Sequence, residues 1–296
     1  MNNRCLSDFI VLLCLILLRS DAGLADGGRV KRLSHPMIDN QTNFIARFVV
    51  SIRTRTPRKY YGDNHFCGGV IISLRFVMTC AHCLIDSQRI LLESRDLLVV
   101  AGSPNRLKFF RSRNVHAPVM EIFVPENFTM YNTNDLALLK LTYPMPTNNQ
   151  YVAVIKLPTQ QPVIEGEYMV LGWGRLYHDG PLASDITHIM VTLYSHLACE
   201  MILNVFTDEM MCAGHVKHKD VNPCAGDLGG PLIANDTVYG IVSYRIGCGH
   251  TELPSVYTNV YENIRWINFI LSNNRSCRLC DYFAQLLFVI AINLYV

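Results

Sequence analysis

The chain has 296 residues and a formal net charge of +2, enough for one large domain or two small ones. The near balance of charge, without a long basic run, excludes the cationic surface typical of nucleic-acid-binding proteins. Eleven cysteines are many for a cytosolic protein and predict disulfides formed in an oxidising compartment.

Residues 1–25 have the pattern of a secretory signal peptide. Arg4 precedes an apolar run from Phe9 to Leu18, and small residues follow at Ala22 and Ala25. The run is too short for an ordinary membrane span, so we expect cleavage after one of these two alanines. An uncleaved membrane anchor is the alternative.

Residues 26–32 form a short pro-segment that ends in the basic run Arg29-Val30-Lys31-Arg32. This run resembles the sites that processing proteases cut, and cleavage after Arg32 would make Leu33 the new N-terminus. A solvated basic patch is the alternative interpretation of the same residues.

From residue 48 onward, short apolar segments alternate with turns that contain Gly, Pro and Asn. Eight such segments predict β-strands, at 48–52, 70–72, 76–78, 97–100, 136–139, 168–171, 238–242 and 256–257. Many short strands indicate an all-β barrel or sandwich, and the pattern alone does not choose between them. A C-terminal helix is also predicted, because Val260, Ile264, Ile267 and Leu271 share one helical face.

Residues 273–296 form a tail with a different composition. A polar stretch up to Cys280 precedes a strongly apolar run from Tyr282 to Val296. A short spacer followed by a hydrophobic end resembles the signal for a glycosylphosphatidylinositol lipid anchor. A short membrane-associating helix, and an apolar tail that packs or is disordered, are the alternatives.

Three motifs then carry residues suited to hydrolytic chemistry. Thr79–Cys83 reads T-C-A-H-C, Asn134–Leu139 reads N-D-L-A-L-L, and Cys224–Leu232 reads C-A-G-D-L-G-G-P-L. A histidine becomes an effective base when a carboxylate orients it, as the residues of the first two motifs could do. Together, the three motifs resemble the chymotrypsin/trypsin family of serine peptidases. Leu228 stands where that family has its nucleophilic serine.

The resemblance covers about residues 33–271 and implies an all-β fold of two perpendicular six-stranded antiparallel β-barrels with a C-terminal α-helix. We therefore expect one trypsin-like domain over residues 33–272. The first barrel would carry His82 and Asp135, and the second would carry Leu228.

The resemblance also implies which parts of the site are kept. His82 and Asp135 match the family's base and its orienting carboxylate, and Gly226 and Asp227 match the loop that builds the oxyanion hole. Leu228 has no proton to give and no lone pair with which to attack, so we predict that the chain is not an active enzyme. We predict neither a cofactor nor a metal ion.

The predicted substrate pocket departs from the family as well. Ser243 matches the buried serine that supports the aspartate, but Arg245 and Ser255 stand where the family has pocket glycines. Asn222 aligns with the pocket floor, where trypsin-like enzymes have aspartate, and Asp220 lies two residues away. We therefore expect a narrowed pocket.

The activation terminus differs too. In the family the new N-terminus, usually Ile-Val-Gly-Gly, folds inward and pairs with the aspartate before the nucleophile. Here Leu33 would begin the chain, and Pro36 replaces the second glycine and stiffens the segment. We expect Asp227 to lack its usual partner or to receive Leu33 imperfectly.

Six cysteines match disulfides of the family, implying the pairs Cys67–Cys83, Cys199–Cys212 and Cys224–Cys248. Among the cysteines left over, Cys80 is interpreted as a buried spare thiol, with attack on a substrate as the less favoured alternative. Cys277 and Cys280 could pair with each other. Gly172-Trp173-Gly174 matches a further family motif. Four glycosylation sequons predict surface positions, at Asn40, Asn127, Asn235 and Asn274.

We therefore predict a secreted, catalytically inactive homologue of the trypsin-like serine peptidases. By analogy with such homologues, its partner would be a protein of a proteolytic cascade: a peptidase, an inhibitor or a substrate. An active trypsin-like serine endopeptidase is one alternative. A membrane-tethered adhesion or display protein, held at the cell surface by a lipid anchor, is the other and depends on the tail alone.

Overall fold

The computed structural model describes residues 35–36 (backbone only), 44–86, 88–129, 133–177, 179–215, 222–244 and 253–274. The chain divides into two units, residues 1–30 and 31–296, and all described residues belong to the second. The predicted signal segment and pro-segment lie outside the described residues. So does the tail from residue 275 onward.

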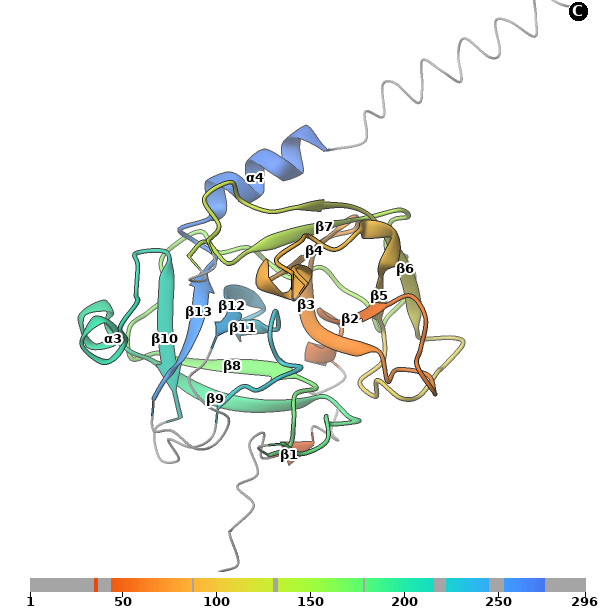
Figure 1. Ribbon diagram of the computed structural model, residues 1–296, viewed down its shortest axis with the longest axis horizontal. Coiled ribbons are helices and arrows are strands. Elements are labelled where there is room, and N and C mark those ends of the chain that lie inside the picture. Colours follow the sequence, from red (N-terminus) through yellow and green to blue (C-terminus); the bar gives the residue numbers. More distant parts are fainter. Residues whose placement is uncertain are drawn as a thin grey trace, which may run out of the picture. The chain divides into compact units, whose positions relative to one another are not determined.

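Six antiparallel strands close into a first barrel, because the apolar segments near the N-terminus can bury their side chains only against one another (Figure 1). Its inward side chains, among them Ile52, Val70 and Leu139, are fully buried. In the order of their pairing the strands are β2 (Val49–Thr54), β3 (His65–Ser73), β4 (Phe76–Thr79), β7 (Ala137–Leu141), β6 (Val115–Phe123) and β5 (Leu97–Ala101).

A second set of six strands also closes, because β8 pairs with both β9 and β11. The two-residue strand β1 (His35–Pro36) pairs with β9 outside this ring. The closed order is β8 (Glu167–Gly172), β9 (Thr187–Leu193), β10 (Met210–Gly214), β13 (Ser255–Asn259), β12 (Thr237–Tyr244) and β11 (Pro231–Ala234).

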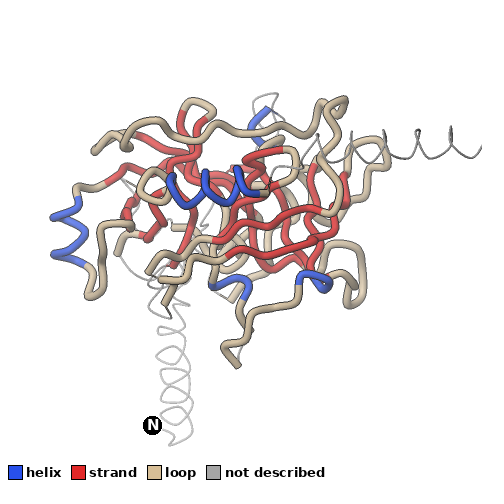
Figure 2. The backbone as a smooth tube through the Cα atoms, turned by 90° about the horizontal axis from the view of Figure 1, so that it is seen from above, coloured by secondary structure: helices blue, strands red, loops and turns tan. Residues whose placement is uncertain are grey.

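In the described part of the chain, helices α3 and α4 lie outside the strands (Figure 2). Helix α3 (His196–Ile202) follows β9 and begins at Ser195, whose side chain accepts a hydrogen bond from the Ala198 amide. Helix α4 (Ile264–Asn273) buries Ile267. Two short 3₁₀ turns, η1 (His82–Leu84) and η2 (Ser94–Asp96), lie between strands of the first barrel.

The predicted fold class is confirmed, with two closed antiparallel barrels and a C-terminal helix. Each predicted strand falls on an observed one, and the predicted helix begins at residue 264, so Val260 lies before it. Five of the observed strands were not predicted: β1, β6, β9, β10 and β11. β6 contains Pro118 and charged or polar residues, and β10 has no β-branched or aromatic residue, so the usual strand signals are weak there.

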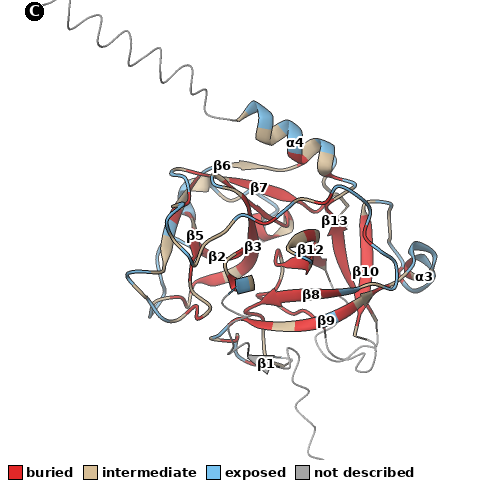
Figure 3. Ribbon diagram, turned by 180° about the vertical axis from the view of Figure 1, so that it is seen from behind, coloured by how far each residue is buried: buried red, intermediate tan, exposed pale blue. Residues whose placement is uncertain are grey.

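Buried residues follow the strands of both barrels, whereas α3 and much of α4 are exposed (Figure 3). Trp173 and Tyr257 are the largest fully buried side chains. In the described part of the chain, no helix combines the length and the apolarity that a bilayer span requires.

Two of the predicted disulfides are confirmed. Cys67–Cys83 joins β3 to η1, and Cys199–Cys212 joins α3 to β10. Each is expected to contribute roughly 2–4 kcal/mol to stability. Cys224 is also disulfide-bonded, and its predicted partner, Cys248, lies outside the described residues.

The backbone at Gly102 supports a first prediction. Gly102 has a φ of +82°, and a Cβ there would lie 2.1 Å from the carbonyl oxygen of Arg113. We expect Gly102→Ala to lower the free energy of unfolding by about 2 kcal/mol, because strained backbone and steric conflict add. Urea unfolding measures the effect. Ser112→Ala, at an exposed residue next to Arg113, is the control, and equal stability of the two variants would contradict the prediction.

Candidate active site

His82 and Asp135 meet because β4 and β7 are neighbours in the first barrel. Thr79 at the end of β4 pairs with Ala137 at the start of β7, so the residues just beyond each strand converge. Nδ1 of His82 lies 2.7 Å from Oδ2 of Asp135, and the His82 amide donates to Oδ1 at 2.9 Å. These two bonds fix the orientation of the imidazole relative to the carboxylate.

The second barrel supports the fully buried Asp135 carboxylate. The Ser243 hydroxyl, from β12, donates to Oδ2 at 2.5 Å. Thr258, from β13, donates to the Asp135 carbonyl oxygen at 2.7 Å. Asn134 before it has a φ of +51°, and its amide donates to Glu209. A buried carboxylate is tolerated because donors from both barrels surround it.

His82 is coupled to both of its neighbours. Burial lowers its pKa, but the adjacent Cys80 sulfur and the hydrogen bond with Asp135 outweigh that effect and raise the pKa above the usual value of histidine. A raised pKa favours the protonated imidazolium, which has no free lone pair with which to accept a proton from a nucleophile.

Cys80 is a free and fully buried thiol. Its sulfur lies 3.8 Å from Nε2 of His82 and 3.0 Å from the sulfur of Cys83. The predicted buried thiol is therefore in contact with the base position, and the sequence analysis did not include this contact. Burial raises the pKa of Cys80 and keeps its sulfur out of reach of solvent.

The Cys224–Leu232 loop is built around the buried carboxylate of Asp227. Oδ1 accepts from the Gly174 amide at 2.6 Å, and Oδ2 accepts from the Cys224 amide at 2.7 Å. A Cβ at Gly172 or Gly174 would lie 2.2 or 2.1 Å from these oxygens. The Gly-Trp-Gly motif therefore leaves the space that Asp227 occupies. The approach of Leu33 to Asp227 falls outside the described residues.

Leu228 follows Asp227 and joins the two barrels. Its carbonyl oxygen accepts a hydrogen bond of 2.7 Å from the amide of Gly68 on β3. Its side chain is partly buried and packs against the hydrophobic clusters of both barrels. A nucleophile needs a reactive atom facing the substrate, and this residue offers an alkyl group that belongs to the packing instead.

The Gly226 peptide, in the predicted oxyanion loop, is held by a residue that sequence reasoning missed. Nε2 of the buried His65 donates to the Gly226 carbonyl oxygen at 3.0 Å, and Ser51 lies 2.8 Å from its Nδ1. The Gly226 carbonyl oxygen can only accept, so the proton of the His65 ring is on Nε2. Nδ1 is then an acceptor, and the Ser51 hydroxyl donates to it. The sequence feature that could have pointed to His65 is its position, two residues before Cys67-Gly68-Gly69 on β3.

The predicted pocket residues occupy buried positions. Ser255 and Asn222 are both buried, and the Ser255 hydroxyl lies 3.4 Å from Oδ1 of Asn222. The two residues predicted to shape the pocket are therefore in contact, and the narrowing of the pocket stays a prediction. Arg245 and Asp220 lie outside the described residues, so their predicted effects on the pocket stay predictions.

Two groups among the described residues have metal-ligand chemistry. One contains Cys67, Cys80 and Cys83, and the other contains Cys80, His82 and Asp135. In the first, two sulfurs are joined in a disulfide. In the second, the Asp135 oxygens already accept hydrogen bonds from His82 and Ser243. We assign neither group to a metal ion.

The predicted modification sites are only partly described. Asn127 and Asn235 are exposed, whereas Asn274 is half-buried and its Oδ1 accepts from Lys140 at 2.9 Å. Asn40 and the predicted processing site at Arg32 and Leu33 lie outside the described residues. Their use stays a prediction.

Comparison with known proteins gives concordant matches. The model of the trypsin family matches residues 39–267. Trypsin zeta of Drosophila melanogaster is 33% identical over 76% of this chain and 81% of its own length. Chymotrypsin-2 of Vespa crabro is 33% identical over 72% and 96%, and trypsin I-P1 of Gallus gallus is 31% identical over 71% and 81%.

The buried His65 predicts a pH dependence of stability. Burial, with Arg106 and Arg53 nearby, lowers its pKa from 6.5 to about 3. Between these values the unfolded chain binds a proton that the folded chain refuses, so stability is lost as the pH falls through this window. From pH 6.5 to 5.0 the loss should be about 2 kcal/mol.

Urea unfolding at several pH values tests this, with His65→Gln as the comparison. Glutamine does not titrate, so the variant should be less stable at pH 7 and should lose less stability on acidification. The difference in slope isolates His65, because the other titrating groups are shared. Parallel slopes would contradict the assignment.

The buried Cys80 predicts a protected thiol. Iodoacetamide should leave Cys80 unmodified in the native protein and should alkylate it after unfolding, because the reagent needs an accessible thiolate. Mass spectrometry of the peptide that contains Cys80 measures both states. Rapid alkylation of this residue in the native protein would show that the thiol is reactive.

Proposed function

The chain belongs to the trypsin family, and we propose that it is a member without peptidase activity that acts by binding another protein. The observation that carries the proposal is the packing of Leu228. At the position where a peptidase presents its hydroxyl, this chain places an alkyl side chain against the hydrophobic clusters of both barrels. Chemistry at that position is lost, while the surrounding framework is kept.

The retained hydrogen bonds around the site favour a binding role over the loss of all function. Asp135 keeps hydrogen bonds from His82, Ser243 and Thr258, and Asp227 keeps the amides of Gly174 and Cys224. A fold that is maintained without its reaction presents the same surfaces to other proteins. We propose a peptidase, an inhibitor or a substrate of extracellular proteolysis as the partner, by analogy with the family.

Secretion is part of the proposal. The N-terminal apolar segment and its small-residue end support it, as do the two disulfides Cys67–Cys83 and Cys199–Cys212. Glycans on the exposed Asn127 and Asn235 would be consistent with the same compartment. Attachment to the cell surface through the tail is the alternative location.

An active endopeptidase is the second candidate, favoured by the intact His82–Asp135 pair and by relatives whose names are those of peptidases. The two candidates differ in the predicted turnover. Removal of the nucleophile lowers the turnover of such enzymes by roughly 10⁶-fold. A fluorophosphonate probe, which labels an activated serine, and broad peptide substrates therefore distinguish them. Stoichiometric labelling of a serine by the probe, or turnover that His82→Ala abolishes, would contradict the proposed inactivity.

Restoring the serine gives a sharper test. We expect Leu228→Ser to remain unlabelled by the fluorophosphonate and to hydrolyse no peptide substrate, because Ser255, which contacts Asn222, is predicted to narrow the substrate pocket. The combined variant Leu228→Ser/Ser255→Gly is the matched comparison, and thermal unfolding of both checks that they fold. Full activity of the single variant would show that Leu228 alone separates this chain from active peptidases.

A further inference from the structure

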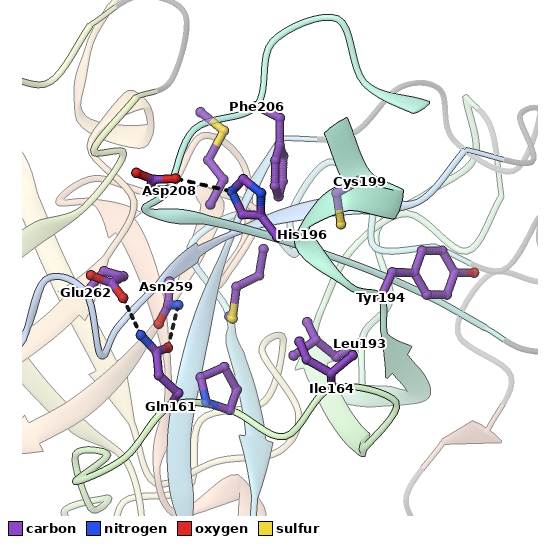
Figure 4. Close-up of a pocket in the computed structure, with 13 residues that line it drawn as sticks. Gln161, Ile164, Leu193, Tyr194, His196, Cys199, Phe206, Asp208, Asn259 and Glu262 are labelled. Carbon is purple, nitrogen blue, oxygen red and sulfur yellow. Dashed lines mark hydrogen bonds and ion pairs between the residues drawn. The ribbon is translucent and has the colours of Figure 1, made fainter. Parts of the chain in front are cut away.

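A cavity of about 490 Å³ opens on the second barrel, between α3, the start of β10 and the segment around residues 161–164 (Figure 4). Buried Leu193, Met210 and Met211 contribute apolar surface to it. Its size lies within the range of cavities that hold ligands or anchoring side chains. None of the residues that line it is His82, Asp135 or Leu228, so it is separate from the candidate active site.

Large apolar side chains are exposed on and after α3, the helix whose His196 and Cys199 line the cavity. Met201 and Leu197 on α3 have exposed fractions of 80% and 66%, and much of this helix has the colour of exposed residues in Figure 3. Ile202 and Val205 are also exposed, and the exposed Ile164 lines the cavity itself. Single exposed apolar residues are common on soluble proteins, but a group beside a cavity marks an interaction site. We call this group the α3 rim.

Carboxylate side chains lie in the wall of the cavity and on the adjacent helix α3. Asp208 is fully exposed, and it lies 3.5 Å from Nε2 of His196, while Glu200 lies 3.7 Å from Nδ1. On the opposite wall Glu262 accepts a hydrogen bond from Gln161, which in turn accepts from Asn259 at 3.2 Å. No lysine or arginine of the described chain lines the cavity. Its field therefore attracts cations.

We propose that the cavity and the α3 rim form a docking site for a segment of a partner protein that carries a large apolar side chain flanked by lysine or arginine. The proposal rests on the proposed binding function and names its surface. The apolar side chain would enter the cavity over Met210 and Met211, as an interface anchor does. The flanking cations would face Asp208 and Glu262, which favours both orientation and rate of encounter.

The same charges disfavour two other occupants. A symmetric dimer through this surface would place Glu200 and Asp208 of one copy against those of the other. An anionic membrane surface would be repelled by the same carboxylates. A basic protein segment is the occupant for which the apolar and the charged features agree.

The choice of variants follows from the contacts. Glu209 is left unchanged, because its side chain accepts from the Asn134 amide and so supports the Asp135 loop. The apolar variant is Leu197→Ser/Met201→Ser. Both residues are exposed, so folding should be preserved. Met120→Ser, at an exposed methionine on β6 of the first barrel, is its matched control.

The charge variant is Glu200→Gln/Asp208→Asn. Its control is Glu93→Gln, at an exposed glutamate that pairs only with Arg95 among the described groups. Neither charge change touches the candidate active site.

The experiment begins with random twelve-residue peptides displayed on phage and selected on the purified full-length protein. Selected peptides are synthesised with a fluorescent label, and binding is titrated by fluorescence anisotropy at low and high salt. We expect the selected peptides to share a large apolar residue next to lysine or arginine. The apolar variant should weaken their binding about tenfold or more, as the loss of an anchoring contact does. The charge variant should weaken it mainly at low salt.

Three outcomes would overturn the proposal: selected peptides without this pattern, undiminished binding to the apolar variant, or equal losses in the Met120 and Glu93 controls. Concentration-dependent self-association that is abolished by the apolar variant would also overturn it, in favour of a second copy as the occupant. Cleavage of the bound peptides is monitored in the same samples. Cleavage with loss of binding in the apolar variant would refute the proposed inactivity and leave the docking site standing.

Discussion

The buried carboxylate of Asp135 is the group on which the candidate site depends. It belongs to the first barrel, but the hydroxyls of Ser243 and Thr258, from the second barrel, bind its side chain and its carbonyl oxygen. A buried charge without donors is strongly destabilising, so the barrels have to keep their relative register for the carboxylate to be satisfied. The position of His82 then follows from two further bonds to the same group.

A second buried carboxylate, that of Asp227, organises the loop that carries Leu228. The loop can bend around it because Gly172 and Gly174 leave space where any side chain would collide with its oxygens. His65 adds a bond from the first barrel to the Gly226 carbonyl oxygen. The site is thus held by polar contacts between the barrels, and none of these contacts requires a serine at residue 228.

Much of this arrangement could be predicted from the sequence, because short motifs report local chemistry. The T-C-A-H-C and N-D-L segments located His82 and Asp135, and the family resemblance that they carry implied the pairs Cys67–Cys83 and Cys199–Cys212. Contacts between segments that lie far apart in the sequence were harder to predict. His65 meets Gly226 across 161 positions, and no local pattern records such a pair. Helix α3 was missed because its apolar residues face solvent, so periodicity did not mark a buried face.

The loss at residue 228 is compatible with the fold because side chain and backbone serve different purposes there. The backbone oxygen accepts from Gly68, and the adjacent Gly229 amide donates to Val242 at 2.8 Å. These bonds are made by any L-residue whose φ and ψ suit the loop. The hydroxyl of the family's serine, by contrast, acts only on substrate. In the inactive protein that we propose, leucine would remove the reaction, while its side chain packs against both hydrophobic clusters.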